Sequence, residues 1–190
     1  MQFSVKYLCV VTAFSQKGKI FMSQNYGNLL YRQGPCGGSG GSLSFDYGIQ
    51  FDLRTAIITN ITLYTGKYFS YTVLSGLSVS YVDSNQNSFG KYFGTVTDQK
   101  STLLLKSDEY ITGVYGVVGS VVDYLQITTN KGRSCSAGIK SSNKSFSFTA
   151  PTAFEGAQSS AIDAQFAIVN FFGWYGSVID SLGIDFRKIG

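Results

Sequence analysis

The residues best suited to binding chemistry lie near the end of the chain, in a stretch that combines two glycines with one acid. Gly173 and Gly176 flank the aromatic pair Trp174–Tyr175, and Asp180 follows four residues after the second glycine. Glycine adopts backbone angles that other residues resist, so a tight loop here can point consecutive N–H groups at one place. Backbone donors beside a carboxylate suit a small polyhydroxyl ligand, because each hydroxyl both donates and accepts hydrogen bonds. The alternative is an ordinary hairpin with a structural aspartate, since Gly and Asp are common turn residues.

The composition indicates a β-rich domain and excludes several kinds of active site. A chain of 190 residues with 44% hydrophobic residues is long enough for one domain with its own core and too apolar for intrinsic disorder. Charged residues make up only 14%, while 22 glycines, 13 tyrosines and 15 phenylalanines favour strands and turns over helices. Because histidine is absent, a Ser-His-Asp triad and a histidine-bound zinc are excluded. The net charge of +4 comes from scattered lysines and arginines, which gives little support for nucleic-acid binding.

Short apolar runs recur along the chain and predict many strands. Residues 77–81 and 145–148 alternate apolar and serine side chains, the pattern of a half-buried strand. In residues 57–63 we expect the odd-numbered side chains to share one face. Residues 153–164 have some helical character, but a glycine among small polar neighbours makes a loop the better interpretation. Many short strands with glycine-rich turns predict an all-β sandwich, barrel or prism.

The first residues resemble a short secretory signal peptide. An apolar run leads to the small residues Ala13 and Ser15, at the two positions that a signal peptidase reads. The alternative is that this run forms the first strand of the fold. We therefore expect a signal peptide over residues 1–15, a leader or edge strand over residues 16–33, and a secreted protein, or a cytoplasmic one if the signal is not real. No other stretch approaches the ~20 apolar residues of a transmembrane helix.

The three cysteines match no zinc-ligand spacing. If the signal peptide is removed, Cys9 leaves with it, and Cys36 and Cys135 remain as an even pair that could form a disulfide in an oxidising compartment. Two free buried thiols are the alternative. Residues 60–62 and 143–145 are N-glycosylation sequons, and the second lies in a polar turn that would expose it better.

Four segments, taken together and in order, resemble the jacalin-related lectin domain. They read GPCGGSGGSLSFD at 34–46, EYITGVYG at 109–116, LQITTNKG at 125–132 and FGWYGSVIDSLG at 172–183. The resemblance spans roughly residues 34–186, and we assign the domain to residues 34–190. It implies a β-prism of three four-stranded antiparallel sheets with pseudo-threefold symmetry. It also implies carbohydrate binding without metal, cofactor or enzymatic activity. Secretion and a single site are nearer to the animal secretory-granule branch than to the cytoplasmic plant members.

The resemblance also assigns the binding residues. The second glycine pair of the opening motif would contribute a backbone N–H, and the loop near the C-terminus would contribute further N–H groups and an ionised carboxylate, a strong acceptor for sugar hydroxyls. The predicted carbohydrate-binding residues are Gly40, Gly41, Tyr175, Gly176, Ser177, Val178 and Asp180.

The sequence departs from the family at three places. Trp174–Tyr175 replaces the usual Arg-Ser pair, and Tyr175 either stacks on the sugar or anchors the loop to the core. The middle glycine-rich loop is degraded at residues 91–95, and residues 65–68 lack the acid of the second site found in some plant members. We therefore expect one sugar site.

Three function classes follow from these observations. The first is a lectin that recognises a hexose of the mannose/glucose or galactose type. The second is a secreted prism that has lost sugar binding and serves as an interaction or matrix protein. The third is a glycosidase, which needs a second carboxylate near Asp180; the candidates are Asp46, Asp108, Glu109 and Asp163. The expected partners are glycans or glycoproteins, with no nucleic acid and no membrane span, and homo-oligomers would raise avidity.

Overall fold

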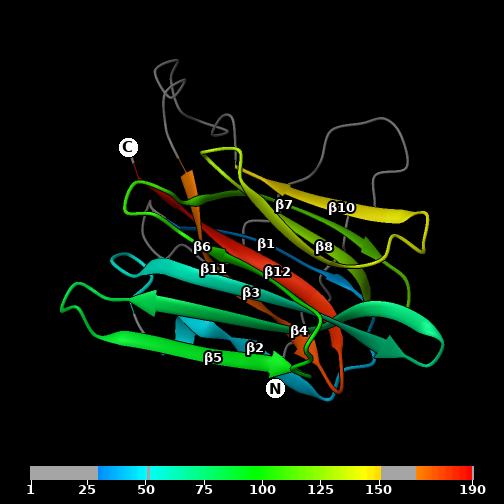
Figure 1. The fold of residues 1–190 in the computed structure, drawn as a ribbon. Helices are drawn as coiled ribbons and strands as arrows, with labels where there is room; N and C mark the ends of the chain where they lie inside the picture. The colour runs from blue at the N-terminus through cyan, green and yellow to red at the C-terminus, as the bar shows by residue number, and fades with distance from the viewer. Residues whose placement is uncertain (1–29, 51, 151–165, 190) are drawn as a thin grey trace, which may run out of the picture.

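In the part of the chain that the structure describes, the protein folds into antiparallel strands with almost no helix (Figure 1). The structure, a computed structural model, describes residues 30–50, 52–150 and 166–189. The predictions for residues 1–15 and 153–164 therefore lie outside the described residues. Within the described ranges the one helical segment is the single 3₁₀ turn η2, Tyr47–Ile49. The strands are β1 Leu30–Gly37, β2 Leu43–Asp46, β3 Ile57–Tyr68, β4 Tyr71–Val82, β5 Ser88–Gly94, β6 Lys100–Leu104, β7 Ile111–Val118, β8 Val122–Thr129, β9 Ser134–Gly138, β10 Lys144–Thr149, β11 Phe166–Tyr175 and β12 Ile179–Lys188.

These strands form three four-stranded antiparallel sheets, as the resemblance implied. The first sheet has the order β2-β11-β12-β1, the second β5-β4-β3-β6 and the third β10-β7-β8-β9. The first and third sheets join through the pairing of Ile168 with Ile111. Each sheet has a central hairpin and two outer strands, and a loop connects the outer strands to each other.

The three outer-strand loops are built alike. Each begins at a glycine with positive φ, Gly37 at 142°, Gly94 at 78° and Gly138 at 82°, and the next strand starts six residues after that glycine. A side chain is excluded at all three, because its Cβ would lie within about 2 Å of a carbonyl oxygen on the central hairpin. The residue after each glycine donates its N–H to that same oxygen: Gly38 to Asp180 at 2.8 Å, Thr95 to Ser75 at 2.8 Å and Ile139 to Asp123 at 3.0 Å.

The equivalent positions therefore follow from backbone geometry alone. Asp180, Ser75 and Asp123 occupy the same place in the three sheets. Two residues before each of them stands a valine, and Val178, Val73 and Val121 pack together in one small buried cluster with the partly buried Tyr68. The three hairpin tips thus meet at one end of the prism.

The core confirms two of the predicted strand patterns and corrects a third. Leu77 and Val79 are fully buried, as the alternation over residues 77–81 predicts. Phe146 and Phe148 are 2% and 4% exposed, as the alternation over residues 145–148 predicts. The prediction that the odd-numbered residues of 57–63 share one face is wrong, because Ile57 is 55% exposed. A bulge between Ile58 and Asn60 shifts the register, so that the residues before it change faces.

The predicted disulfide between Cys36 and Cys135 is also wrong. Cys135 is a free, buried thiol on β9, and burial raises its pKa to about 12. The two residues stand on strands at opposite ends of the pairing order, β1 in the first sheet and β9 in the third. No helix within the described ranges is long and apolar enough to cross a membrane.

Candidate functional site

The tight loop between β11 and β12 forms one wall of the candidate site. The N–H of Gly176 donates to the carbonyl oxygen of Val178 at 3.0 Å, which closes the turn. Ser177 at its tip is exposed, and its carbonyl accepts a 2.6 Å hydrogen bond from the hydroxyl of Thr95 in the β5–β6 loop. The turn is therefore fixed by a contact with the second sheet as well as by its own backbone.

The loop between β1 and β2 forms the opposite wall, and the Asp180 carboxylate lies between the two. A Cβ atom on Gly40 would lie 2.9 Å from Oδ1 of Asp180, and one on Gly41 would lie 2.9 Å from Oδ2. The Gly41 Cβ would also lie 2.7 Å from the backbone nitrogen of Tyr175. The two glycines thus bring their backbones against the carboxylate where any side chain would cover it. This juxtaposition of residues 40–41 with residues 175–180 is the one that the sequence predicted.

The Asp180 carboxylate is buried but poorly supplied with donors. The residue is 6% exposed, and burial raises its pKa above the ordinary value although the N–H of Gly176 lowers it. Glu109 is the opposite case. It is also buried, but it accepts hydrogen bonds from Thr129 at 2.7 Å and Arg133 at 2.6 Å, and these contacts hold its pKa below the ordinary value despite its burial. Asp180 therefore keeps acceptor capacity for an external donor.

Several backbone donors around this carboxylate also have spare capacity. Four N–H groups donate to no other group in the part of the chain that the structure describes: those of Gly40, Gly41, Ser177 and Val178. Val178 is only 2% exposed, and an unpaired N–H in a buried residue is rare in native proteins. The site thus combines unused donors with an unused acceptor. In the described part of the chain, no group of three or more Cys, Asp and Glu side chains could hold a metal ion.

The two aromatic residues of the loop point in different directions. The Tyr175 ring packs against core aromatics, with centroid distances of 5.3 Å to Phe93 and 6.0 Å to Phe45. It anchors the loop to the core, which is the second of its two expected roles, and its contact with a ligand stays a prediction. Trp174 is 46% exposed on β11, with its neighbours Ser44 and Ser181 on the adjacent strands.

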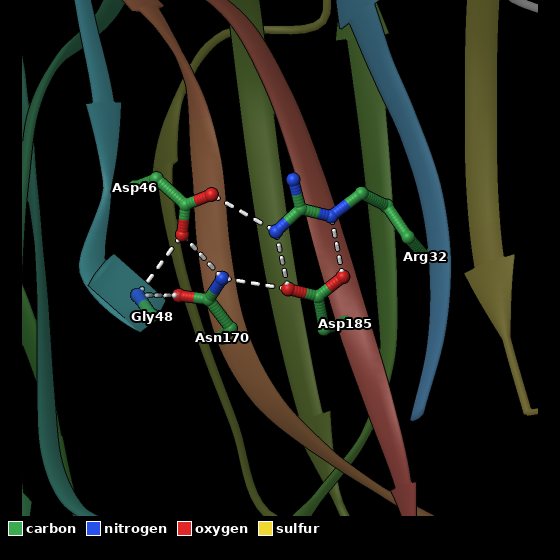
Figure 2. A network of polar contacts seen from close by, with 5 residues as sticks. All are labelled: Arg32, Asp46, Gly48, Asn170 and Asp185. Atoms are coloured by element: carbon green, nitrogen blue, oxygen red, sulfur yellow. Dashed lines mark hydrogen bonds and ion pairs between the residues drawn. The ribbon is translucent and has the colours of Figure 1, made fainter. Parts of the chain in front are cut away.

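A partly buried polar network ties together the strands that carry both walls (Figure 2). Arg32 on β1 binds Asp185 on β12 through Nε at 2.7 Å and Nη2 at 2.8 Å, and Nη2 also contacts Asp46 at 2.9 Å. The amide of Asn170 on β11, which is fully buried, donates to both Asp46 and Asp185 at 2.7 Å, and Gly48 donates to Asp46 and Asn170. Burial lowers the pKa of Arg32, but the two acids more than offset this and raise it.

This network holds β1 and β2, which flank the glycine loop, against β11 and β12, which flank the acid loop. The sequence reasoning missed it. Arg32 falls in the segment of residues 16–33 that carries no pattern, and Asp185 is 153 residues away along the chain. The one available signal was Asp46, the acid that closes the opening motif.

The equivalent place in the third sheet has the same acid loop but a different facing loop. Residues 119–123 read GSVVD, against GSVID at 176–180, and Gly119 donates to Val121 at 3.0 Å, as Gly176 does to Val178. Asp123 is 7% exposed. Its carboxylate accepts a 2.9 Å hydrogen bond from the hydroxyl of Ser141, which stands where the first sheet has Gly40. The protein's own hydroxyl therefore occupies one oxygen of this carboxylate, Oδ2. In the second sheet the acid is replaced by Ser75.

Comparisons with known proteins agree with this architecture. Among solved structures, the chain is similar to wild-type Malaysian banana lectin, with a TM-score of 0.64 at 20% identity over 83% of this chain and 98% of that one. It is similar to AcmJRL, a mannose-binding jacalin-related lectin from Ananas comosus, with a TM-score of 0.63 at 20% identity over 84% and 99% of the two chains. It is also similar to artocarpin complexed with methyl-α-mannose, with a TM-score of 0.63 at 24% identity over 85% and 99%.

At these identities the solved structures establish the fold. A search of curated proteins gave no match. The family is established separately, because the model of the Jacalin-like lectin domain matches residues 33–185, most of the chain. The protein therefore belongs to the jacalin-like lectin domain family.

Proposed function

We propose that this protein is a lectin that binds one hexose, of the mannose/glucose or galactose type, at the end of the prism where Asp180 lies. The observation that carries the proposal is the buried Asp180 carboxylate, which lies directly against Gly40 and Gly41 of the facing loop and receives few hydrogen bonds from the protein. Vicinal sugar hydroxyls would supply the missing donors and accept from the unpaired N–H groups in return.

Each residue has a distinct part in this proposal. Asp180 accepts hydrogen bonds from two neighbouring hydroxyls, and its charge strengthens them. The N–H groups of Gly41, Ser177 and Val178 donate to sugar oxygens. Gly40 keeps the approach to the carboxylate open, because a side chain there would contact Oδ1. No step requires a metal ion or a cofactor. Two similar structures, a mannose-binding lectin and a complex with methyl-α-mannose, support the choice of ligand class.

The glycosidase alternative receives no comparable support. Of the candidate second acids, Asp46 is paired with Arg32, Asp108 with Lys131 and Glu109 with Arg133. Asp163 lies outside the described residues. Acid–base hydrolysis of a glycosidic bond needs two carboxylates about 5–10 Å apart across the bond, with at least one of them free to exchange a proton. The function that we propose is therefore binding, in a protein that we expect to be secreted on the basis of residues 1–15 alone.

A glycan array of the purified protein, followed by calorimetric titration with methyl glycosides of mannose, glucose and galactose, tests the proposal. We expect binding to at least one hexose, with one site per chain. Absence of binding to every glycan would favour the interaction-protein alternative instead.

A further inference from the structure

We infer that the tip of the β3–β4 hairpin is an aromatic platform for a second sugar residue of the glycan whose first residue sits at Asp180. The platform consists of Tyr68, Phe69 and Tyr71. This inference rests on the proposed function and extends it, because it makes oligosaccharides, rather than free hexoses, the preferred ligand class.

The platform is adjacent to the candidate site by direct packing. Tyr68 packs against the valine cluster that includes Val178, and Val178 belongs to the acid loop, between Ser177 and Asp180. The ring of Phe69 stands edge-on to the ring of Tyr68, with centroids 4.8 Å apart and an angle of 70° between the planes. A continuous line of side chains therefore runs from the acid loop to Phe69.

Tyr71 lies on the same side as Tyr68. The two residues pair directly across the hairpin, and directly paired residues in an antiparallel ladder project to the same face. Tyr71 is 61% exposed, so most of its ring is available beside the packed Tyr68.

Phe69 has the features of a residue kept for contact with a ligand. It is 84% exposed, so folding gains little from its ring. Its φ is 54°, a conformation that favours Gly or Asn and is strained for a bulky side chain. The other non-glycine residue with positive φ in the described part of the chain is Gln86, a polar residue in an ordinary turn. A strained, exposed phenylalanine stabilises the fold less than glycine or asparagine would at the same position.

The chemistry of the platform fits a sugar ring. A hexose has one face of C–H groups that packs on an aromatic ring, and tyrosine adds a hydroxyl that can pair with sugar hydroxyls at the ring edge. Because the platform borders the Asp180 site, the next residue of a bound glycan is the occupant within reach.

The test is calorimetric titration of the full chain with two probe pairs: methyl α-mannoside with mannotriose, and methyl β-galactoside with a galactose trisaccharide. The key variant is the double substitution Phe69→Asn with Tyr71→Ser. Asparagine tolerates the positive φ, so the turn and the thermal unfolding temperature should be kept or improved. Leu104→Ser is the matched control, because Leu104 is 67% exposed on β6 of the same sheet, at the end of the strand that lies away from the β5–β6 loop.

We expect the wild type to bind the trisaccharide of its preferred pair about tenfold more tightly than the monosaccharide, the size of one good aromatic contact. The double variant should lose this preference and keep its monosaccharide affinity within about twofold, while Leu104→Ser changes neither. An unchanged trisaccharide preference in the double variant, or a wild type without any preference, overturns the platform but leaves the proposed function standing. A wild type that binds none of the four probes overturns both.

Discussion

The acid loops at 176–180 and 119–123 are nearly identical, yet within the described ranges the protein donates a side-chain hydrogen bond to the second carboxylate and none to the first. Both contain Gly-Ser-Val followed by an aliphatic residue and Asp, both close with the same backbone hydrogen bond, and both bury the carboxylate to a similar extent. The difference lies in the facing loop. Gly40 and Gly41 leave the Asp180 carboxylate open, whereas the Ser141 hydroxyl already donates to Asp123.

The acid loop alone therefore does not decide whether its carboxylate keeps capacity for an external donor. The backbone frame that positions the carboxylate repeats in every sheet, because each loop glycine and the following N–H are tied to the same carbonyl oxygen. Whether the carboxylate is free depends on two side-chain positions in the loop opposite.

Replacement of the two acids should give the largest contrast. Asp180→Asn should weaken hexose binding at least about 100-fold, because it replaces two or more charge-assisted hydrogen bonds by neutral ones. The unfolding temperature should not fall, since burial of this charge is unfavourable. Asp123→Asn is the control and should leave the affinity unchanged. Titration calorimetry and thermal unfolding of both variants measure this. Equal losses of affinity in the two variants would contradict the assignment of the site.

Closing the open site should have the next largest effect. Gly40→Ser reproduces the arrangement at Ser141, and its Cβ would contact only Asp180 Oδ1 within 4 Å. We expect hexose affinity to fall roughly tenfold or more, with a change of less than about 1 kcal/mol in the free energy of unfolding. Gly41 is less informative, because a side chain there also meets the backbone of Tyr175. Unaltered affinity of Gly40→Ser would show that the ligand does not approach past Gly40.

Removal of the serines that face Asp123 should have a smaller effect. In an Asp180→Asn background, the pair Ser141→Gly with Ser142→Gly frees the Asp123 carboxylate and restores glycines opposite it. We expect weak binding, with a dissociation constant of about 1 mM, that disappears when Asp123→Asn is added. Saturation-transfer NMR is sensitive enough to detect it. If no signal appears in a folded variant, the two serines are not the only difference that prevents binding at Asp123.

The effect of pH should be the smallest, but it should change hexose affinity and stability in opposite directions. The pKa of Asp180 is raised, and binding uses the ionised form, so affinity should fall as the pH drops through that pKa, starting at higher pH than for an exposed aspartate. Stability should change in the opposite direction. The folded protein holds the Asp180 proton more tightly than the unfolded chain does, so this contribution to stability is present below the unfolded pKa and is lost as the pH rises through the folded one. Titrations and denaturant unfolding, each compared with Asp180→Asn, check both slopes, and parallel slopes would contradict the raised pKa.

The sequence predicted the fold and the meeting of residues 40–41 with Asp180, because glycine-rich segments and one acid occur in the order typical of a known family. It did not predict that Asp123, the equivalent of Asp180 in the third sheet, accepts a hydrogen bond from Ser141. The repeat GSVVD at 119–123 is visible in the printed sequence, but its facing serine comes from a loop eighteen residues further on.

The other differences have physical reasons of the same kind. A β-bulge leaves no trace in an alternating pattern, so the exposure of Ile57 could not be read from its neighbours. Cysteine pairing depends on distances in the folded state, and an even count suggested a pair that the structure does not form, since Cys135 is a free thiol. The Arg32 network joins residues that are adjacent only after β1, β11 and β12 have formed the first sheet.

The most direct test of the Asp180 site is a structure of the protein crystallised with the hexose that it binds best in titration. We expect a single sugar, with two hydroxyls on the Asp180 carboxylate and with N–H donors from Gly41, Ser177 and Val178. We expect no sugar at Asp123, where the Ser141 hydroxyl remains in place. A sugar bound at Asp123, or one held away from Asp180, would contradict this expectation.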